Sequence, residues 1–361
     1  METCLDEDVM LALLSSRATN LPDVQAHLDL CAECRGVFAE LVKASRGPSI
    51  VPRARITRDR GPKRVDPRRQ ADAEDLPVPG ETVADRFVLE HSLGKGAAGI
   101  VFAARNLADG TPRALKFLRT ASAEHVRRMR REAAVLRAIR HPSIVFVHEI
   151  VETERRGPAL VMELLEGESL EARLAGGRTM GIEELAPIAR GILAALAAAH
   201  ARGVVHRDLK PANVFLVRGA DGDGESRVRV LDFGMAKLDL AWRSEGLTPA
   251  ITRSGTVMGT PLYMAPEQVF CEREIDGRAD LWSLGVILYR ALTGRLPVEA
   301  HTFADLMKVL STGSVRPFAP MPSVPRGVRD LVERLLSVRP ELRPRSSEEA
   351  MFALRARETY A

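Results

Sequence analysis

The stretch HRDLKPAN, residues 206–213, places side chains of complementary chemistry within eight positions. Asp208 is a carboxylate, Lys210 a cation, and Asn213 carries an amide oxygen. Nineteen residues beyond Asn213, the stretch LDFG (231–234) supplies a second carboxylate, Asp232. An eight-residue stretch of this kind is a far more specific signal than a short glycine pattern.

Upstream of this stretch, GKGAAGIV (94–101) follows an apparent strand and brings three glycines together. Glycines let backbone amides approach phosphates closely. The pattern alone could open a dinucleotide-binding helix or form a simple turn, but the following IVFA favours a second strand and hence a hairpin over a nucleotide. Lys116, in the apolar stretch RALKFL, needs a partner, and Glu132 in RREAAVL is the candidate. The alternative is that both are solvated surface charges.

Two further signatures, MAPE (264–267) and DLWSLG (280–285), follow in order. Together the five stretches resemble the motifs of bacterial serine/threonine protein kinases of the eukaryotic type, over residues 81–357. The resemblance implies an α+β, two-lobe protein kinase fold, with a small antiparallel β lobe before a large helical lobe. Short β-like runs up to Leu165 and mostly helical patterns after Leu170 agree with it, and GADGDGES (219–226) is expected as a turn between strands.

The resemblance implies four catalytic residues. Asp208 would accept the proton of the acceptor hydroxyl and orient it, and Lys210 would neutralise the γ-phosphate. Lys116 would hold the α- and β-phosphates of ATP and pair with Glu132. These roles suit phosphoryl transfer, because its loose, highly charged transition state needs positioning and cations more than a strong base.

The resemblance also implies the ligands of ATP and of two Mg²⁺ ions. The magnesium ligands would be Asn213 and Asp232. The residues expected around ATP are Gly94, Gly96, Gly99, Val101, Ala114, Lys116, Met162, Glu163 and Leu165.

Other matches are expected to be scaffold. The expected contacts are a buried ion pair of Glu267 with Arg343, a cap by Asp280 on the 206–213 backbone, and a stack of Leu136, His206 and Phe233. One residue departs from the family pattern, because Ala98 stands at the glycine-loop tip where an aromatic is usual. We expect looser closure over ATP but retained catalysis. The alternative is a pseudokinase-like scaffold, against which the intact Lys116, Asp208 and Asp232 argue.

Substrate class and regulation follow from the same resemblance. Lys210 and Thr260 are typical of serine/threonine kinases, so the expected substrates are protein serine and threonine hydroxyls. Arg207 is expected to receive a phosphate from the activation loop, added in trans within a transient homodimer. The candidate phosphorylation sites in that loop are Thr248, Thr252, Ser254 and Thr256, with Ser254 aligning best.

Composition sets the wider frame. A hydrophobic content of 45% and a charged content of 28% over 361 residues are ordinary for a soluble protein. No apolar run reaches 18 residues and the first ten residues are acidic, so we expect no transmembrane segment, no signal peptide and a cytoplasmic location.

Residues 46–80 have the composition of a flexible linker. Its basic part, 46–69, holds nine Lys/Arg against two Asp and could touch nucleic acid or an anionic surface. No aromatic residue interleaves it to stack on bases, so the plain linker is favoured and nucleic-acid binding is not expected.

Residues 1–45 show three short helical patterns and the stretch HLDLCAECR (27–35). His27, Cys31 and Cys34 could converge on a zinc ion, and Cys4 is the candidate fourth ligand. The spacing resembles the zinc-binding anti-sigma module. The alternatives are a metal-free thiol pair or an incidental cluster.

The role of such a zinc ion is open between folding, docking of a protein partner, and redox sensing by zinc release. ATP and protein substrates are the other expected partners. The rival function for the whole chain is a zinc-dependent interaction protein whose kinase fold serves as scaffold.

Overall fold

The computed structural model describes residues 76–96, 99–118, 130, 133–134, 136–153, 157–219, 227–233, 260–272, 274–318 and 324–358. Contacts divide the chain into two compact units, 1–66 and 67–361, of which the first lies wholly outside the described residues. The expected zinc ligands also lie outside them: Cys4, His27, Cys31 and Cys34.

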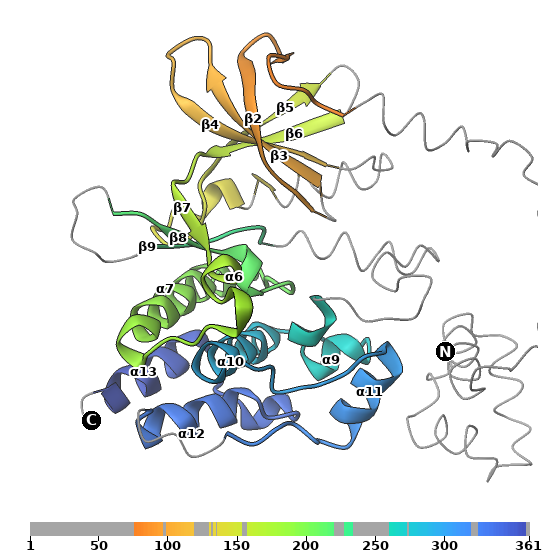
Figure 1. Cartoon of the computed structure of the whole chain (residues 1–361), viewed down its shortest axis with the longest axis vertical. Helices are drawn as coiled ribbons and strands as arrows, with labels where there is room; N and C mark the ends of the chain where they lie inside the picture. Colours follow the sequence, from red (N-terminus) through yellow and green to blue (C-terminus); the bar gives the residue numbers. More distant parts are fainter. Residues whose placement is uncertain are drawn as a thin grey trace, which may run out of the picture. The chain divides into compact units, whose positions relative to one another are not determined.

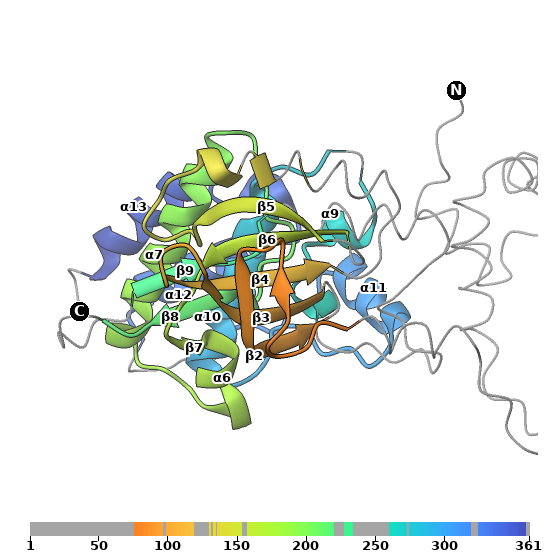
Figure 2. The ribbon, with the colours of Figure 1, turned by 90° about the horizontal axis from the view of Figure 1, so that it is seen from above.

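An antiparallel sheet forms the first part of the described chain (Figures 1 and 2). Its strand order is β1-β2-β3-β4-β6-β5, with every neighbouring pair antiparallel. The strands are β1 (Thr82–Val83), β2 (Phe87–Gly96), β3 (Gly99–Asn106), β4 (Pro112–Leu118), β5 (Val147–Thr153) and β6 (Gly157–Glu163). The expected small antiparallel β lobe is therefore confirmed.

The two faces of this sheet bury different residues, because successive side chains of a strand point to opposite faces. Leu115 and Phe117 of β4 join Phe102 in a core on one face, where the two phenylalanine rings meet edge to face. Ala114 of β4 belongs instead to the large core shared with the helices, and Lys116, two residues further along, lies on the same face as Ala114. The pattern of β4 thus turns Lys116 toward the second lobe.

The sequence predicts a helix over 123–140, between β4 and β5. The described residues Ala133, Ala134 and 136–138 are helical, and Ala133 and Leu136 are buried. Glu132 lies outside the described residues, so its pairing with Lys116 stays a prediction.

A second, three-stranded antiparallel sheet separates the first sheet from the helices (Figure 1). It contains β7 (Gly167–Ser169), β8 (Val214–Val217) and β9 (Arg227–Val230), in that order. Strands β8 and β9, which flank the expected turn at 219–226, pair with each other, and residues 220–226 lie outside the described residues. Since β8 begins directly after Asn213 and β9 ends two residues before Asp232, this hairpin brings the two expected magnesium ligands to the same edge.

Helices make up the rest, as the sequence predicts (Figure 1). They are α6 (Leu170–Arg173), α7 (Ile182–His200), α9 (Pro266–Val269), α10 (Arg278–Thr293), α11 (Phe303–Ser311), α12 (Arg326–Leu335) and α13 (Ser347–Glu358). The short 3₁₀ turns are η1 (Ala175–Gly177), η2 (Pro211–Asn213), η3 (Thr260–Tyr263) and η4 (Pro340–Leu342).

Helix α10 is the buried centre of this lobe and carries the DLWSLG stretch. Almost all of its residues are buried, which fits a helix that is apolar on most of its faces. At Gly285, an added Cβ would lie 2.9 Å from Leu335 Cβ, so the glycine permits α12 to pack close. Among the described residues, no helix combines the length and apolar character needed to cross a membrane.

Candidate active site

The HRDLKPAN loop is fixed to α10 through Asp280. The buried carboxylate accepts the backbone N–H of His206 at Oδ2 and the backbone N–H of Arg207 at Oδ1, each at a distance of 2.8 Å. Arg207 adopts a φ of +65°, a left-handed conformation that non-glycine residues rarely take. Both carboxylate oxygens therefore stabilise a strained backbone directly before Asp208, which confirms the expected cap.

The ring of His206 links this loop to the segment that carries Asp232. It lies 4.7 Å from the Phe233 ring between centroids, and its Nε2 is 2.8 Å from the Leu231 carbonyl oxygen. The His206 and Phe233 rings of the expected stack are therefore in contact. Leu136 lies in the same buried hydrophobic cluster as Phe233.

The Asp208 carboxylate contacts two polar side chains of its own loop, Lys210 and Asn213. Lys210 Nζ lies 2.8 Å from Asp208 Oδ2 and 3.1 Å from Oδ1. Asn213 Nδ2 donates to the Asp208 carbonyl at 2.8 Å and to Oδ2 at 3.1 Å. Because the amide group is planar, this orientation leaves Asn213 Oδ1 on the opposite side as a ligand atom. The side chains of Asp208 and Lys210 are each 22% exposed, so a substrate can reach them.

Asp232 follows β9 with a φ of +58° and contacts Lys116 across the two sheets. Lys116 Nζ lies 2.5 Å from Asp232 Oδ1; the lysine side chain is 5% exposed and the aspartate 29%. Burial alone would raise the pKa of Asp232. The charges of Lys116, His206 and Lys210 outweigh it and hold that pKa below its ordinary value. Asp232 is therefore ionised at neutral pH and suited to bind a cation.

The glycine stretch forms a hairpin, as the sequence predicts. Gly96 at the end of β2 pairs with Gly99 at the start of β3, and Gly99 has a φ of +151°. No helix follows the glycines, because β3 continues to Asn106. The geometry excludes the strand-to-helix turn of a dinucleotide-binding unit at this point and leaves two paired strands that can fold over phosphates.

Apolar residues expected around the adenine of ATP lie on neighbouring strands. Ala114 faces Met162 in the register of β4 and β6, and both are buried. Val101 pairs with Lys116 in the register of β3 and β4 and packs against the same core, as does Leu165.

Glu163 has a structural role that sequence reasoning missed. Its N–H donates to the Phe146 carbonyl at 3.0 Å, and its Oε1 accepts the Phe146 N–H at 2.9 Å. The same oxygen lies 3.3 Å from Arg229 Nε on β9. Glu163 thus braces the end of β6 against the start of β5 and against the second sheet.

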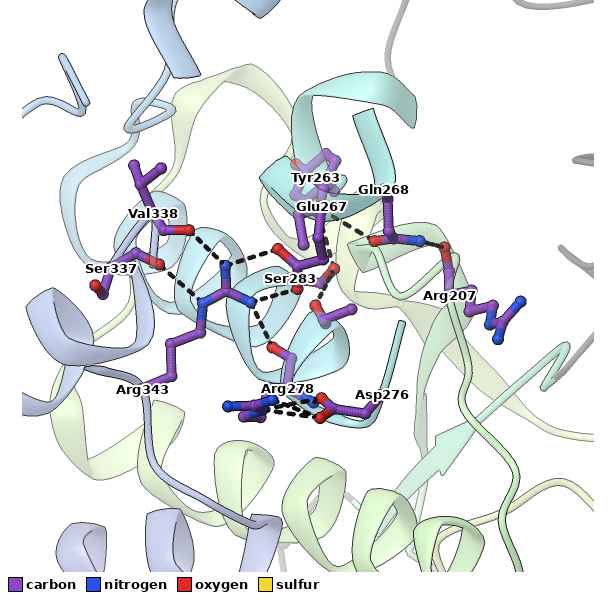
Figure 3. Close-up of polar contacts among 12 residues, drawn as sticks. Arg207, Tyr263, Glu267, Gln268, Asp276, Arg278, Ser283, Ser337, Val338 and Arg343 are labelled. Carbon is purple, nitrogen blue, oxygen red and sulfur yellow. Dashed lines mark hydrogen bonds and ion pairs between the residues drawn. The ribbon is translucent and has the colours of Figure 1, made fainter. Parts of the chain in front are cut away.

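The ion pair of Glu267 with Arg343 anchors the second lobe (Figure 3). The guanidinium forks onto both carboxylate oxygens at 2.7 and 2.9 Å, and the side chains are 4% and 0% exposed. Arg343 also donates to the carbonyl oxygens of Ser337 and Arg278 and lies over the Trp282 ring. The expected buried pair is confirmed, and its remaining donors are used as a buried charge requires.

Gln268 connects this anchor to the HRDLKPAN loop, which sequence reasoning also missed. Its Nε2 donates to the Arg207 carbonyl at 2.8 Å, and its Oε1 accepts the Ala265 N–H at 3.1 Å (Figure 3). Its position directly after MAPE was the only signal in the sequence.

Four of the expected regulatory residues lie outside the described part of the chain: Thr248, Thr252, Ser254 and Thr256. Thr260 begins η3.

Across the described residues, no group of three or more His, Cys, Asp or Glu side chains is arranged to hold a metal ion. Asp232 and the Asn213 amide are only two ligand groups, so they do not form a cluster of three. A magnesium ion held by them would take its remaining ligands from phosphate oxygens.

Comparison with known proteins supports this geometry. The family model for the protein kinase domain matches residues 87–352. Serine/threonine-protein kinase Pkn1 of Myxococcus xanthus is 39% identical over 262 residues, which are 71% of this chain and 36% of that protein. Serine/threonine-protein kinase pkn2 of the same organism is 36% identical over 286 residues, 77% of this chain and 33% of that protein.

A plant relative and a solved structure extend the comparison. CBL-interacting protein kinase 16 of Oryza sativa subsp. japonica is 36% identical over 281 residues, 76% of this chain and 58% of that protein. The chain thus spans about a third to somewhat over half the length of these relatives. The crystal structure of the Mycobacterium tuberculosis PknI kinase domain, a double mutant, aligns with a TM-score of 0.57 at 24% identity, over 78% of this chain and all of that one, and shows the shared fold. The chain belongs to the protein kinase domain family.

Proposed function

We propose that this protein transfers the γ-phosphate of ATP to serine and threonine hydroxyls of other proteins. The observation that carries the proposal is the pair of acidic residues at one edge of the β8–β9 hairpin, each with its own lysine. Asp208 contacts Lys210, and Asp232 contacts Lys116. The Leu231 N–H donates to the Asn213 carbonyl at 2.8 Å and holds the two ends of the hairpin together. Two of the relatives are named as serine/threonine-protein kinases, which supports the same reaction.

The reaction assigns a task to each residue. The acceptor oxygen attacks the γ-phosphorus, the bond to the β,γ-bridging oxygen breaks, ADP leaves, and the acceptor proton passes to Asp208. Lys210 neutralises the transferred group, and Lys116 binds the α- and β-phosphates. Two Mg²⁺ ions, held by Asn213 Oδ1 and the Asp232 carboxylate, would neutralise the charge on the phosphate oxygens.

The nucleotide is proposed to lie between the glycine hairpin and the second lobe. Its expected contacts are Gly94, Gly96, Gly99, Val101, Ala114, Lys116, Met162, Glu163 and Leu165. The β hairpin at the glycines and the buried Ala114–Met162 pair support this placement. Since Glu163 N–H is already bonded to Phe146, the adenine would use other backbone atoms of this segment.

Labelled ATP tests the reaction and the substrate class together. The protein is incubated with γ-labelled ATP, Mg²⁺ and dephosphorylated casein, and the casein is hydrolysed to phosphoamino acids. The proposal expects phosphoserine and phosphothreonine, because Lys210 and Thr260 follow the serine/threonine pattern. Phosphotyrosine as the main product would overturn the substrate class. If no labelled phosphate were transferred to casein, the alternative of a pseudokinase-like scaffold would be favoured.

Activation-loop phosphorylation in trans, within a transient homodimer, is proposed to raise activity through Arg207. The Arg207 backbone is held on both sides, by Asp280 and Gln268, and Figure 3 shows its guanidinium pointing away from the Gln268 amide. Within the described residues it has no carboxylate partner, which leaves it available for a phosphate. Peptide mapping of active protein should find phosphate between 247 and 259, first at Ser254. Active protein without phosphate there would contradict the proposal.

The domain order is proposed as a zinc-binding helical module at 1–45, a linker at 46–80 and the kinase domain at 81–357. The cysteine and histidine spacing supports the module. One zinc per chain in protein purified without added metal, lost in Cys31→Ser, is the expected result. Reactive thiols without zinc would contradict it. The need for ATP supports the expected cytoplasmic location.

A further inference from the structure

The segment 260–268 enters the described structure directly after the expected activation loop and is held by several polar contacts. Ser283 Oγ donates to the Tyr263 carbonyl at 2.8 Å. Gln268 binds the Arg207 carbonyl, and Glu267 binds Arg343 (Figure 3). Ser283, Gln268 and Glu267 are all buried, so these contacts lie inside the lobe and serve the scaffold.

A further contact on this segment differs because it reaches solvent. Arg290 Nη1 donates to Tyr263 Oη at 2.5 Å. The same guanidinium forks onto both carboxylate oxygens of Glu171, at 2.7 Å each. The side chains of Arg290 and Glu171 are 20% and 46% exposed. The junction therefore lies at the surface of the lobe, whereas the other contacts of this segment are buried.

The junction joins three elements that are far apart in the sequence. Arg290 is on α10, Glu171 on α6, and Tyr263 closes η3. Burial of the Tyr263 ring raises the pKa of its hydroxyl, so the hydroxyl stays neutral and its oxygen accepts a hydrogen bond from Arg290. The hydrogen bond to Glu171 raises the pKa of Arg290, so its charge is permanent. A planar fork that serves two acceptors at once fixes geometry in a way that a lysine cannot.

From these contacts we infer that Arg290 is a positioning residue for the protein acceptor. It holds Tyr263, and through Tyr263 it sets where the 260–268 segment lies relative to the HRDLKPAN loop, to which Gln268 connects. Glu171 keeps the guanidinium in place. The inference rests on the proposed function, because the acceptor hydroxyl must reach Asp208. The junction does not contact the Lys116–Asp232 pair, so it acts on the acceptor and leaves the nucleotide unaffected.

Steady-state kinetics with casein and MgATP test the inference in three variants. Tyr263→Phe removes one hydrogen bond and keeps the ring, Arg290→Met removes the fork, and Arg290→Lys keeps only the charge. Each should raise the KM for casein about 10-fold, the effect of losing one hydrogen bond to a charged group. The KM for ATP and kcat should stay within about 2-fold, because nothing at the phosphates moves. The combination of Tyr263→Phe with Arg290→Met should cost no more than Arg290→Met alone.

Arg334→Met is the matched control. It breaks another partly exposed Arg–Glu pair of the same lobe, with Glu349 at 2.5 Å, away from the 260–268 segment. It should leave both KM values unchanged. An unchanged casein KM in Tyr263→Phe and Arg290→Met, or an equal rise in the ATP KM, would overturn the inference.

Hydrogen exchange separates this inference from the proposed function. In Arg290→Met the amides of 262–265 should exchange faster, while those of α12 should not. This readout needs no catalysis, so it applies even if the wild type fails to phosphorylate casein, which would contradict the proposed function alone. Unchanged exchange in 262–265 would show that Arg290 does not position the segment.

Discussion

Replacing Asp280 by asparagine should detach the HRDLKPAN loop from α10. In the wild type the two carboxylate oxygens accept the N–H groups of His206 and Arg207, and Oδ2 also lies 2.7 Å from His200 Nε2. Asparagine keeps one oxygen and presents an NH₂ group to the other donor. A buried donor that loses its acceptor costs about 1–3 kcal/mol, more for bonds to charged groups.

The expected loss is about 3 kcal/mol, because at least one of the donors faces the NH₂ group in either orientation of the amide. For a domain of this size each kcal/mol lowers Tm by about 2–4 °C, so we expect a decrease of about 6–12 °C. Arg207 would also lose the support of its left-handed conformation. Displacement of Asp208 by about 1 Å should then lower kcat about 100-fold.

Thermal unfolding and casein kinetics measure both effects, with Asp276→Asn as the control. Asp276 precedes the same helix but is exposed and pairs with Arg278 at 2.8 Å, so its loss should cost under about 1 kcal/mol. A Tm within about 2 °C of wild type and an unchanged kcat for Asp280→Asn would refute the reasoning, because the loop would then be held by other contacts.

Three further results are expected. Arg343→Met leaves Glu267 buried without its partner and should lower the free energy of unfolding in urea by about 3–5 kcal/mol; a loss under about 1 kcal/mol would count against a buried pair. The pKa of Asp232 is lowered, so the stability from its carboxylate is complete above its ordinary value of 3.8 and is lost only as pH falls through the folded-state value. The difference in unfolding free energy between wild type and Asp232→Asn should therefore stay constant from about pH 5 to 8 and shrink only below about pH 4; shrinkage near pH 6 would disagree. Arg207→Ala should make phosphatase-treated and untreated protein equally active, and a retained difference would argue against phosphate binding there.

Sequence predicted those parts of the site that lie within contiguous motifs. The loop around Asp208, the glycine hairpin and the strand alternation that turns Lys116 inward all follow from local pattern and residue chemistry. The pairs Glu267–Arg343 and Asp280 with the 206–207 backbone were predicted only through the family resemblance, because nothing local links residues so distant in the chain.

The rest could not be predicted because it depends on tertiary packing. Arg290 and Glu171 are 119 residues apart and carry no periodic signal, so their shared contact with Tyr263 becomes visible only in three dimensions. The contacts of the Glu163 amide and carboxylate with Phe146 could likewise not be predicted from the sequence, and the nucleotide contact of Glu163 stays a prediction. Strands β7 and β8 are short and lie among helical patterns, where local propensity is a weak guide.

The most direct test of the central claim is kcat/KM for casein phosphorylation in Asp208→Asn, measured beside its thermal stability. Asparagine keeps the size of the side chain but cannot take up the acceptor proton. We expect kcat/KM to fall by about 10²–10⁴, with Tm within about 2 °C of wild type. Undiminished phosphotransfer by a folded Asp208→Asn protein would contradict the assignment of this carboxylate and the reaction proposed from it.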